Sequence, residues 1–144
     1  MNLRYLLDTS IVSSPISAQP DPGILDKLEK HGHECAIAAL VWHELTFGCR
    51  RLSHGKRRDA LETYLQDVVR ASFPILAYDE AASTWLGVER ARLESRGKSV
   101  GFVDGQIAAI ARVNELTLVT VNVKDFSRFK DLEVENWSKR AGST

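Results

Sequence analysis

The sequence predicts an α/β fold in which a parallel sheet of four or five strands is covered by helices. Three observations support this fold class: short continuous apolar runs, amphipathic segments between them, and turn residues at the boundaries. Strands buried on both faces read as continuous apolar runs, and alternation with helices is typical of parallel sheets. We expect residues 1–144 to form one domain, with residues 138–144 as a flexible tail.

The first half of the chain alternates strand, helix, strand and helix. Apolar residues 3–7 predict a strand, and the prolines that follow predict a loop. A helix is expected over 23–31, where three apolar residues share one stripe and Gly32 ends it. Residues 35–38 are apolar throughout and predict the second strand, which precedes a helix over 40–52.

The second half continues this alternation. An apolar stripe predicts a helix over 56–70, and the apolar run that follows predicts a strand over 74–77. Asp79 is a suitable N-cap for a long helix over 80–95. The remaining expected elements are an alanine-rich helix over 102–114, a strand over 117–121 and a short edge strand over 132–135.

Composition excludes several classes of protein. No apolar run approaches the roughly 20 residues that span a bilayer, so no membrane partner is expected. Asp8 follows the start too closely for an export signal, and we therefore expect a cytoplasmic protein. Cys35 and Cys49 have no metal or redox spacing and are expected to be reduced core thiols. The chain has neither a Gly-rich phosphate loop nor a nucleophile elbow.

Four acidic residues stand at the ends of apolar runs. They are Asp8, Glu44, Asp104 and Asp125. Parallel strands end at one edge of their sheet, where α/β proteins bind ligands. Carboxylates gathered there would repel one another unless a cation neutralised them, and Mg²⁺ or Mn²⁺ favours oxygen ligands. The pattern predicts a divalent metal site.

Each acid also has a purely structural interpretation. Asp8 would cap a following helix, Asp104 would suit the dipole of a first helical turn, and Asp125 would start a turn. Glu44 is expected inside the apolar arc of its helix, where Arg51 could supply an ordinary ion pair. Four independent coincidences at one sheet edge are a weaker explanation than one shared site.

Charge alone argues against a nucleic-acid partner, because 19 basic residues balance 19 acidic residues. If a metal neutralises the four acids, however, the 19 basic residues face only 15 acidic ones. A basic cluster is formed by Arg50, Arg51, Lys56, Arg57 and Arg58. This cluster is either a solvated helix surface or a surface that contacts phosphates.

In order and spacing, these motifs resemble a PIN domain of the VapC toxin family. The matching segments are residues 6–10, the helix that carries Glu44, and residues 101–111, 118–126 and 129–137. The most specific parts are D-x-x-I-A-A, beginning at Asp104, and T-x-N-x-x-D-F, beginning at Thr120. The resemblance covers nearly the whole chain; Val121 departs from it, since many relatives carry a polar or basic residue there.

The resemblance implies a three-layer α/β/α domain and a metal-dependent endoribonuclease. Such proteins are usually homodimeric toxins of type II toxin–antitoxin pairs and are inhibited by a VapB antitoxin. By position, Asp8, Glu44 and Asp104 would be the core ligands of Mg²⁺ or Mn²⁺, with Asp125 a more variable fourth. The supporting positions implied by the resemblance are Thr9, Thr120 and Asn122.

The implied reaction is hydrolysis of a structured RNA, of the tRNA or rRNA class, by water activated on one or two Mg²⁺ ions. The basic cluster would hold the RNA backbone. One alternative is a PIN nuclease of RNA processing that has no antitoxin. Another is a receiver-like phosphoacceptor module with Thr120 and Lys124, although that class expects paired acids after the first strand and an aspartate after the third.

Overall fold

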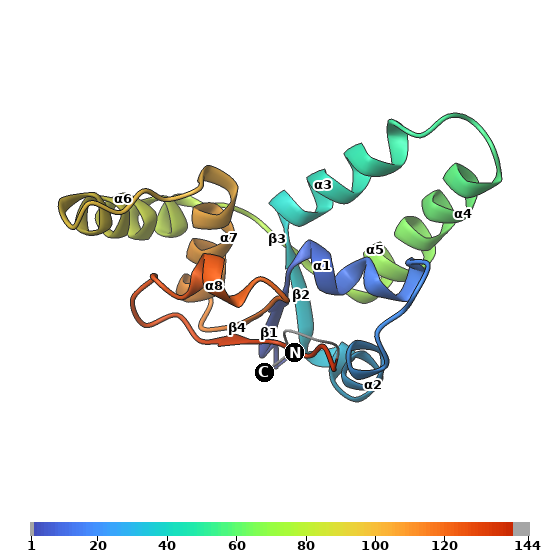
Figure 1. The fold of residues 1–144 in the computed structure, drawn as a ribbon, viewed down its shortest axis with the longest axis horizontal. Coiled ribbons are helices and arrows are strands. Elements are labelled where there is room, and N and C mark those ends of the chain that lie inside the picture. Colours follow the sequence, from blue (N-terminus) through green and yellow to red (C-terminus); the bar gives the residue numbers. More distant parts are fainter. Residues whose placement is uncertain (1, 140–144) are drawn as a thin grey trace.

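Five parallel strands form one sheet in the order β3-β2-β1-β4-β5, with helices on both sides (Figure 1). The structure is a computed structural model that describes residues 2–139. The strands are β1 (Tyr5–Leu7), β2 (Cys35–Ala38), β3 (Ile75–Leu76), β4 (Thr117–Val119) and β5 (Val134–Glu135). The expected α/β/α architecture is confirmed, and the sheet has the larger of the two expected strand numbers.

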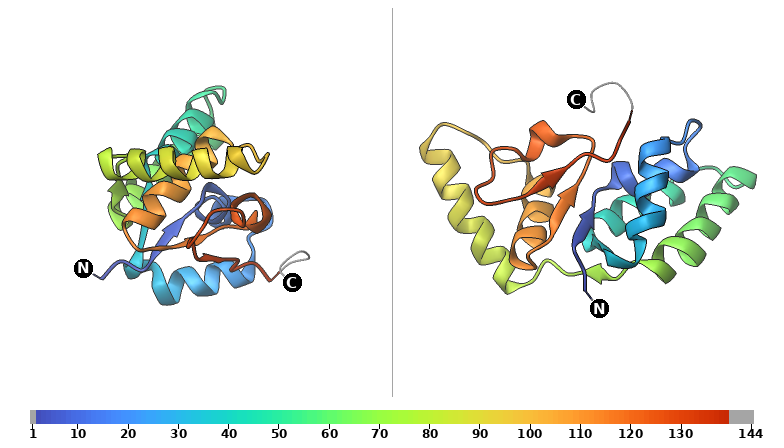
Figure 2. Two further views of the ribbon diagram at one scale, coloured as in Figure 1. Left: turned by 90° about the vertical axis from the view of Figure 1, so that its left-hand side faces the viewer. Right: turned by 90° about the horizontal axis from the view of Figure 1, so that it is seen from below.

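Helices α6 (Glu80–Ser95), α7 (Phe102–Val113) and α8 (Val123–Phe126) lie on one side of the sheet (Figures 1 and 2). The other side carries α1 (Thr9–Val12), α2 (Pro22–His31), α4 (Lys56–Tyr64) and α5 (Arg70–Ser72), while α3 (Ala39–Arg50) rises from the end of β2. Short helical turns complete the chain as η1 (Ser14–Ile16), η2 (Gly32–Glu34) and the π-helical η3 (Leu65–Val69). The single helix expected over 56–70 is therefore interrupted by a π segment.

Strand β1 is the centre of the sheet because it pairs with β2 on one side and β4 on the other. Leu6 lies opposite both Ala36 and Leu118, and none of these three residues is exposed. Burial on both faces accounts for the uninterrupted apolar runs in the sequence. For this reason the sequence predicts the core strands well. The edge strands β3 and β5 have only two residues each and are shorter than the sequence predicts.

The strand order excludes the receiver-like alternative. Receiver modules have the order 2-1-3-4-5, in which the third strand is adjacent to the first. Here β3 lies at the edge beyond β2, and β4 takes the place beside β1. Asp79 follows β3 but caps α6, since its Oδ1 accepts a hydrogen bond from Ala82 N–H at 2.9 Å. No phosphoacceptor aspartate therefore stands at the end of the third strand.

The end of the described chain is held against α2 by Asp21. Its carboxylate caps Gly23 and Ile24 N–H and also accepts hydrogen bonds from Ser138 Oγ at 2.5 Å and Lys139 N–H at 3.1 Å. Burial alone would raise the pKa of Asp21, but these hydrogen bonds outweigh it and lower the pKa to about 2. The expected tail begins with two anchored residues; residues 140–144 lie outside the described part.

Both cysteines are free and buried, as expected. Burial, reinforced by the neighbouring Glu34 charge, raises the pKa of Cys35 to about 12, and burial also raises the pKa of Cys49. These thiols are therefore protonated at neutral pH. Within residues 2–139 no helix combines the length and apolar character needed to cross a membrane.

A Gly23→Ala substitution should destabilise the domain. The added Cβ would lie 2.5 Å from the Trp137 carbonyl oxygen and 2.9 Å from Lys139 N, so backbone must move. We expect a loss of about 2 kcal/mol in the free energy of unfolding, measured by urea denaturation. Gly48→Ala is the matched control because a Cβ there meets no atom within 4 Å. A stability change no larger than that of the control would contradict the close packing at Gly23.

Candidate active site

The site lies where the strand order changes direction, between the carboxyl ends of β1 and β4. Asp8 follows β1, caps α1 through Oδ1 and Thr9 N–H at 2.9 Å, and accepts a 2.7 Å hydrogen bond from Thr120 Oγ1 on Oδ2. Asp8 is 9% exposed and Thr120 is fully buried. Each carboxylate oxygen therefore has a fixed partner, and the expected cap at Asp8 coexists with its place at the site.

Thr120 also organises the turn that leaves β4. Its Oγ1 accepts a hydrogen bond from Asn122 N–H at 3.0 Å, and Val121 N–H donates to Ser10 Oγ at 3.3 Å. These contacts connect the segment after β4 to the segment after β1. The turn leads into the short helix α8, which carries the exposed Asp125.

Asp104 reaches the site because α7 packs closely against its neighbours. The buried face of this helix consists of Gly105, Ile107, Ala108, Ala109, Ile110 and Ala111. A Cβ on Gly105 would come within 2.8 Å of Val100 Cγ1 and 3.0 Å of Leu86 Cδ1, so only a small residue allows this approach without rearrangement. Burial, followed by the charges of Asp125 and Asp8, raises the pKa of Asp104.

Glu44 lies outside the buried arc of α3, and the expectation that it falls inside that arc is wrong. The buried stripe is Val41, Leu45 and Cys49, at intervals of one helical turn, and Glu44 is about 100° away from it. Phe47, also expected inside, is 61% exposed. The periodicity alone did not show which of two overlapping apolar stripes would face the sheet.

The Glu44 carboxylate nevertheless interacts electrostatically with the other acids of the site, although the residue as a whole is exposed. Loss of hydration, followed by the charge of Asp8, raises its pKa; the charge of Asp104 adds to this, and the Thr9 hydroxyl opposes it. The alternative ion pair with Arg51 does not form, since that guanidinium lies over the Phe47 ring, 5.7 Å from its centroid.

The four acids thus form one electrostatically coupled group, and in residues 2–139 none of them takes part in an ion pair. Thr9 Oγ1 is buried beside them without a hydrogen bond of good geometry. As the side chains stand, however, the described chain contains no group of three or more acids, histidines or cysteines close enough to hold one metal ion. Mutual repulsion favours such a separated arrangement.

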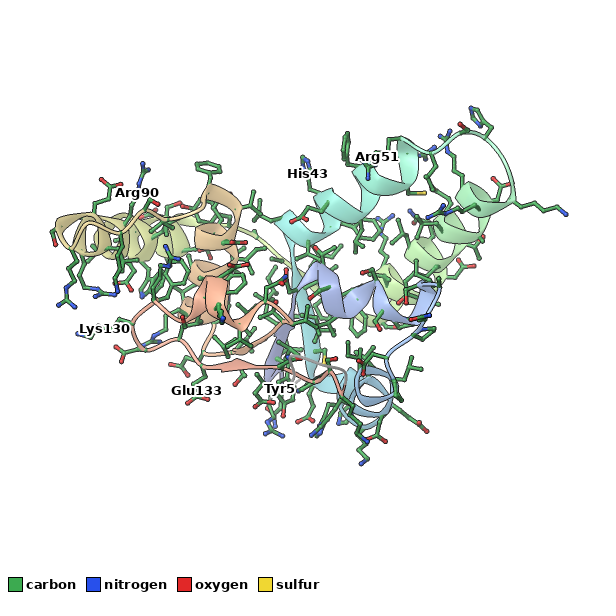
Figure 3. The ribbon with its side chains drawn as sticks, in the orientation of Figure 1. Tyr5, His43, Arg51, Arg90, Lys130 and Glu133 are labelled. Carbon is green, nitrogen blue, oxygen red and sulfur yellow. The ribbon has the colours of Figure 1, made fainter. Side chains whose placement is uncertain are left out.

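The expected basic cluster lies at the far end of the α3–α4 hairpin rather than around the carboxylates (Figure 1). Arg50 pairs with Glu62 at 3.3 Å, and Arg58 Nη1 donates to Leu52 O at 3.4 Å. Figure 3 shows His43 and Arg51 on α3 and Arg90 on α6 on the same side of the molecule. On this side Arg90 pairs with Glu94 at 2.9 Å.

The charge of Arg128, a residue that the sequence motifs did not single out, lowers the pKa of Asp104. Arg128 stands three residues after Asp125 but beyond the end of α8, so helical spacing did not point to it. Its position depends on contacts with α6 and the α6–α7 loop, which the sequence does not reveal.

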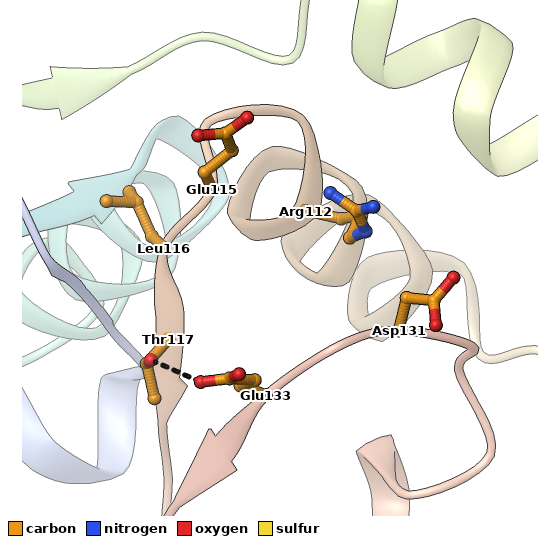
Figure 4. A pocket seen from close by; sticks show the side chains of 6 residues that line it. All are labelled: Arg112, Glu115, Leu116, Thr117, Asp131 and Glu133. Carbon is orange, nitrogen blue, oxygen red and sulfur yellow. Dashed lines mark hydrogen bonds between the residues drawn. The ribbon is translucent and has the colours of Figure 1, made fainter.

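A cavity of about 300 Å³ lies at the opposite edge of the sheet (Figure 4). It is lined by Arg112, Glu115, Leu116, Thr117, Asp131 and Glu133. Thr117 begins β4 and donates a 3.4 Å hydrogen bond to Glu133, which places the cavity at the amino ends of the strands. In parallel α/β sheets ligands bind at the carboxyl ends, so this cavity is not the candidate active site.

Comparison with known families agrees with this fold and site. The PIN domain profile matches residues 5–132, and the chain therefore belongs to the PIN-domain family. It is 33% identical to Ribonuclease VapC2 of Rickettsia felis, over 94% of this chain and 98% of that protein. It is 31% identical to the tRNA(fMet)-specific endonuclease VapC of Shigella flexneri, over 94% of this chain and 99% of that protein. The resemblance to VapC toxins is thereby confirmed.

A solved structure gives the same result in three dimensions. VapBC2 from Rickettsia felis, bound to a DNA fragment from its promoter, matches with a TM-score of 0.80 at 29% identity. The match covers 94% of this chain and 100% of that chain.

Asp104→Asn should stabilise the protein in the presence of a chelator. Because the pKa of Asp104 is raised in the folded state, ionisation of this carboxyl lowers the free energy of unfolding. The loss is absent at about pH 3, where the carboxyl is mostly protonated in both states, and develops as the pH rises through the raised pKa. We expect a gain of about 1 kcal/mol at pH 7 by urea denaturation, vanishing near pH 3. Asp67→Asn, an exposed acid on η3, is the control. Equal or lower stability of Asp104→Asn at pH 7 would contradict the raised pKa of Asp104.

Proposed function

We propose that this protein is a metal-dependent endoribonuclease and the toxin of a type II toxin–antitoxin pair. The observation that carries the proposal is the coupled group of four carboxylates at the switch point of a PIN sheet, none of which is ion-paired to any residue that the structure describes. The names of the relatives, Ribonuclease VapC2 and tRNA(fMet)-specific endonuclease VapC, support the activity. They also favour a structured RNA, such as a tRNA, as the substrate class.

The donor set fits Mg²⁺ or Mn²⁺. All four side chains supply hard oxygen ligands. Burial, followed by the charges of neighbouring acids, raises the pKa of Glu44 and of Asp104, and a bound divalent cation would oppose both effects. Glu44 and Asp104 lie on helices α3 and α7, so rotation of their side chains would bring the oxygens inward without disturbing the sheet. When bound, the ion would lower the pKa of a water and stabilise the leaving oxygen.

The protein groups have distinct roles in this proposal. Asp8 is the fixed ligand, because Thr120 Oγ1 and Thr9 N–H hold both of its oxygens. Thr120 also fixes Asn122 N–H, and so the turn that leads to Asp125. Glu44 and Asp104 would complete the set from two helices. No protein nucleophile is required, since hydrolysis by water needs only a positioned phosphodiester.

The site opens to solvent rather than into an enclosed pocket, since Glu44 and Asp125 are exposed. Such a surface suits a bulky substrate, and RNA is read mostly in unstacked loops and ends. The surface around His43, Arg51 and Arg90 would contact its backbone (Figure 3). Binding through phosphates would weaken as salt is raised.

A VapB-type antitoxin is the proposed inhibitory partner, as the VapBC2 structure of Rickettsia felis contains such a pair. A homodimer is also proposed. Phe47 on α3 is 61% exposed and Phe102 on α7 is 72% exposed, and large apolar side chains in water commonly mark a contact with another protein. An RNA-processing nuclease without an antitoxin would share the active site but would not arrest growth when expressed alone.

Expression of the wild-type protein should arrest growth and fragment one RNA species, whereas Asp104→Asn should do neither. Removal of one of four metal-binding carboxylates should lower cleavage at least about 100-fold, the scale for loss of a group that stabilises the transition state. Growth curves and RNA gels would measure this, with Asp67→Asn as an active control. Equal toxicity of wild type and Asp104→Asn would overturn the proposal.

Removal of divalent ions should abolish RNA cleavage, and Mg²⁺ or Mn²⁺ should restore it. The same ions should raise the midpoint of thermal unfolding of the wild-type protein, because a ligand that binds only the folded state stabilises it. The shift should be smaller for Asp8→Asn, measured by differential scanning fluorimetry. A full shift in that variant would show that the ion binds elsewhere.

A further inference from the structure

A buried ion pair anchors the segment that follows α8. Glu89 on α6 is 5% exposed, and its carboxylate accepts hydrogen bonds from Arg92 Nε and Nη2, both at 2.7 Å. Lys130 N–H donates to the same carboxylate at 2.6 Å. Arg92 and then Lys130 N–H lower the pKa of Glu89 against the effect of burial. A buried charge is tolerable here because both of its oxygens are satisfied.

The same pair fixes a second backbone group of this segment. Arg92 Nη2 donates to Arg128 O at 3.2 Å, so the main chain is held on both sides of Phe129. Phe129 is itself 4% exposed and packs near Trp85 on α6, with ring centroids 6.2 Å apart. The backbone around Arg128 is therefore a rigid extension of α6 rather than a free loop.

The Arg128 side chain is held against the loop that precedes α7. Its Nη1 donates to Ser99 O at 2.5 Å, in the loop that leads to Gly101, the N-cap of α7. Asp104 lies in the first turn of this helix, and Asp125 lies three residues before Arg128 in the chain. Arg128 is therefore anchored between the segments that carry two of the four acids. Within residues 2–139, Arg128 has no acidic partner at ion-pair distance. Most of its five N–H donors remain available on an exposed side chain.

We propose that Arg128 is a substrate-binding residue that holds a phosphate of the RNA backbone next to the carboxylate site, and that Glu89 and Arg92 position it. The inference rests on the proposed function and names the group that binds the substrate there. An RNA phosphate approaching four carboxylates is repelled by them, and a fixed guanidinium at the edge offsets that repulsion. Its planar fork can donate two parallel hydrogen bonds to one phosphate, which an ammonium group cannot.

The test is RNA binding in the Asp104→Asn background, where cleavage is prevented. A short fluorescein-labelled single-stranded RNA of mixed sequence is titrated by fluorescence anisotropy across a range of salt concentrations. Arg128→Gln should weaken binding about tenfold and reduce the slope of log Kd against log salt by about 0.7, which corresponds to one lost phosphate contact. Arg128→Lys should restore the slope but only part of the affinity.

Arg4→Gln is the matched control for charge, since it removes one exposed arginine before β1, at the opposite edge of the sheet. It should leave the affinity within about twofold of the background and the slope of log Kd against log salt unchanged. A Glu89→Gln variant that remains folded by circular dichroism should shift binding in the same direction as Arg128→Gln, because it loosens the backbone that carries the guanidinium.

The outcomes separate the two claims. If the wild-type protein cleaves RNA but Arg128→Gln binds with the slope of Arg4→Gln, the role of Arg128 is overturned and the nuclease assignment stands. If the wild-type protein neither cleaves nor binds RNA, both are overturned. A parallel loss of affinity and slope in Arg128→Gln, with an unchanged unfolding midpoint, supports the phosphate contact over a role in folding.

Discussion

The hydrogen bond between Thr120 Oγ1 and Asp8 Oδ2 is the contact on which the site depends. It joins the ends of β1 and β4, the two strands that flank the change of direction in the sheet. Both residues are buried, so the bond is shielded from water and orients the carboxylate within the crevice. Because Thr120 also accepts from Asn122 N–H, one hydroxyl fixes an acid and the turn that leads to Asp125.

The rest of the site is a compromise between packing and repulsion. The small residues of α7 allow close approach, which brings Asp104 toward Asp8, and the approach itself raises the pKa of Asp104. Burial and repulsion between like charges disfavour the ionised form of Asp104, and the proposed divalent cation would offset this cost. A site of this kind is consistent with the observation that functional positions often conflict with maximal stability.

The buried Glu89–Arg92 pair shows how a surface segment acquires a fixed position. A buried ion pair contributes little net stability compared with apolar packing, but it specifies which groups it contacts. Here it contacts the backbone on both sides of Phe129, so α6 determines where Arg128 can point. The Arg128 guanidinium is held against Ser99 O in the loop before α7.

The sequence by itself determined the strand–helix alternation, the buried core strands and the four acids, since burial on both faces leaves continuous apolar runs and polar residues at strand ends stand out. It did not determine which face of α3 would be buried, because Leu45 and Phe47 both continue an apolar stripe. Only the tertiary structure decided that Glu44 lies near Asp8 and Asp104 and that Arg128 is held against the loop before α7. Those positions depend on contacts between residues that are distant in the chain, such as Glu89 and Lys130. Such contacts produce no periodic pattern in the sequence.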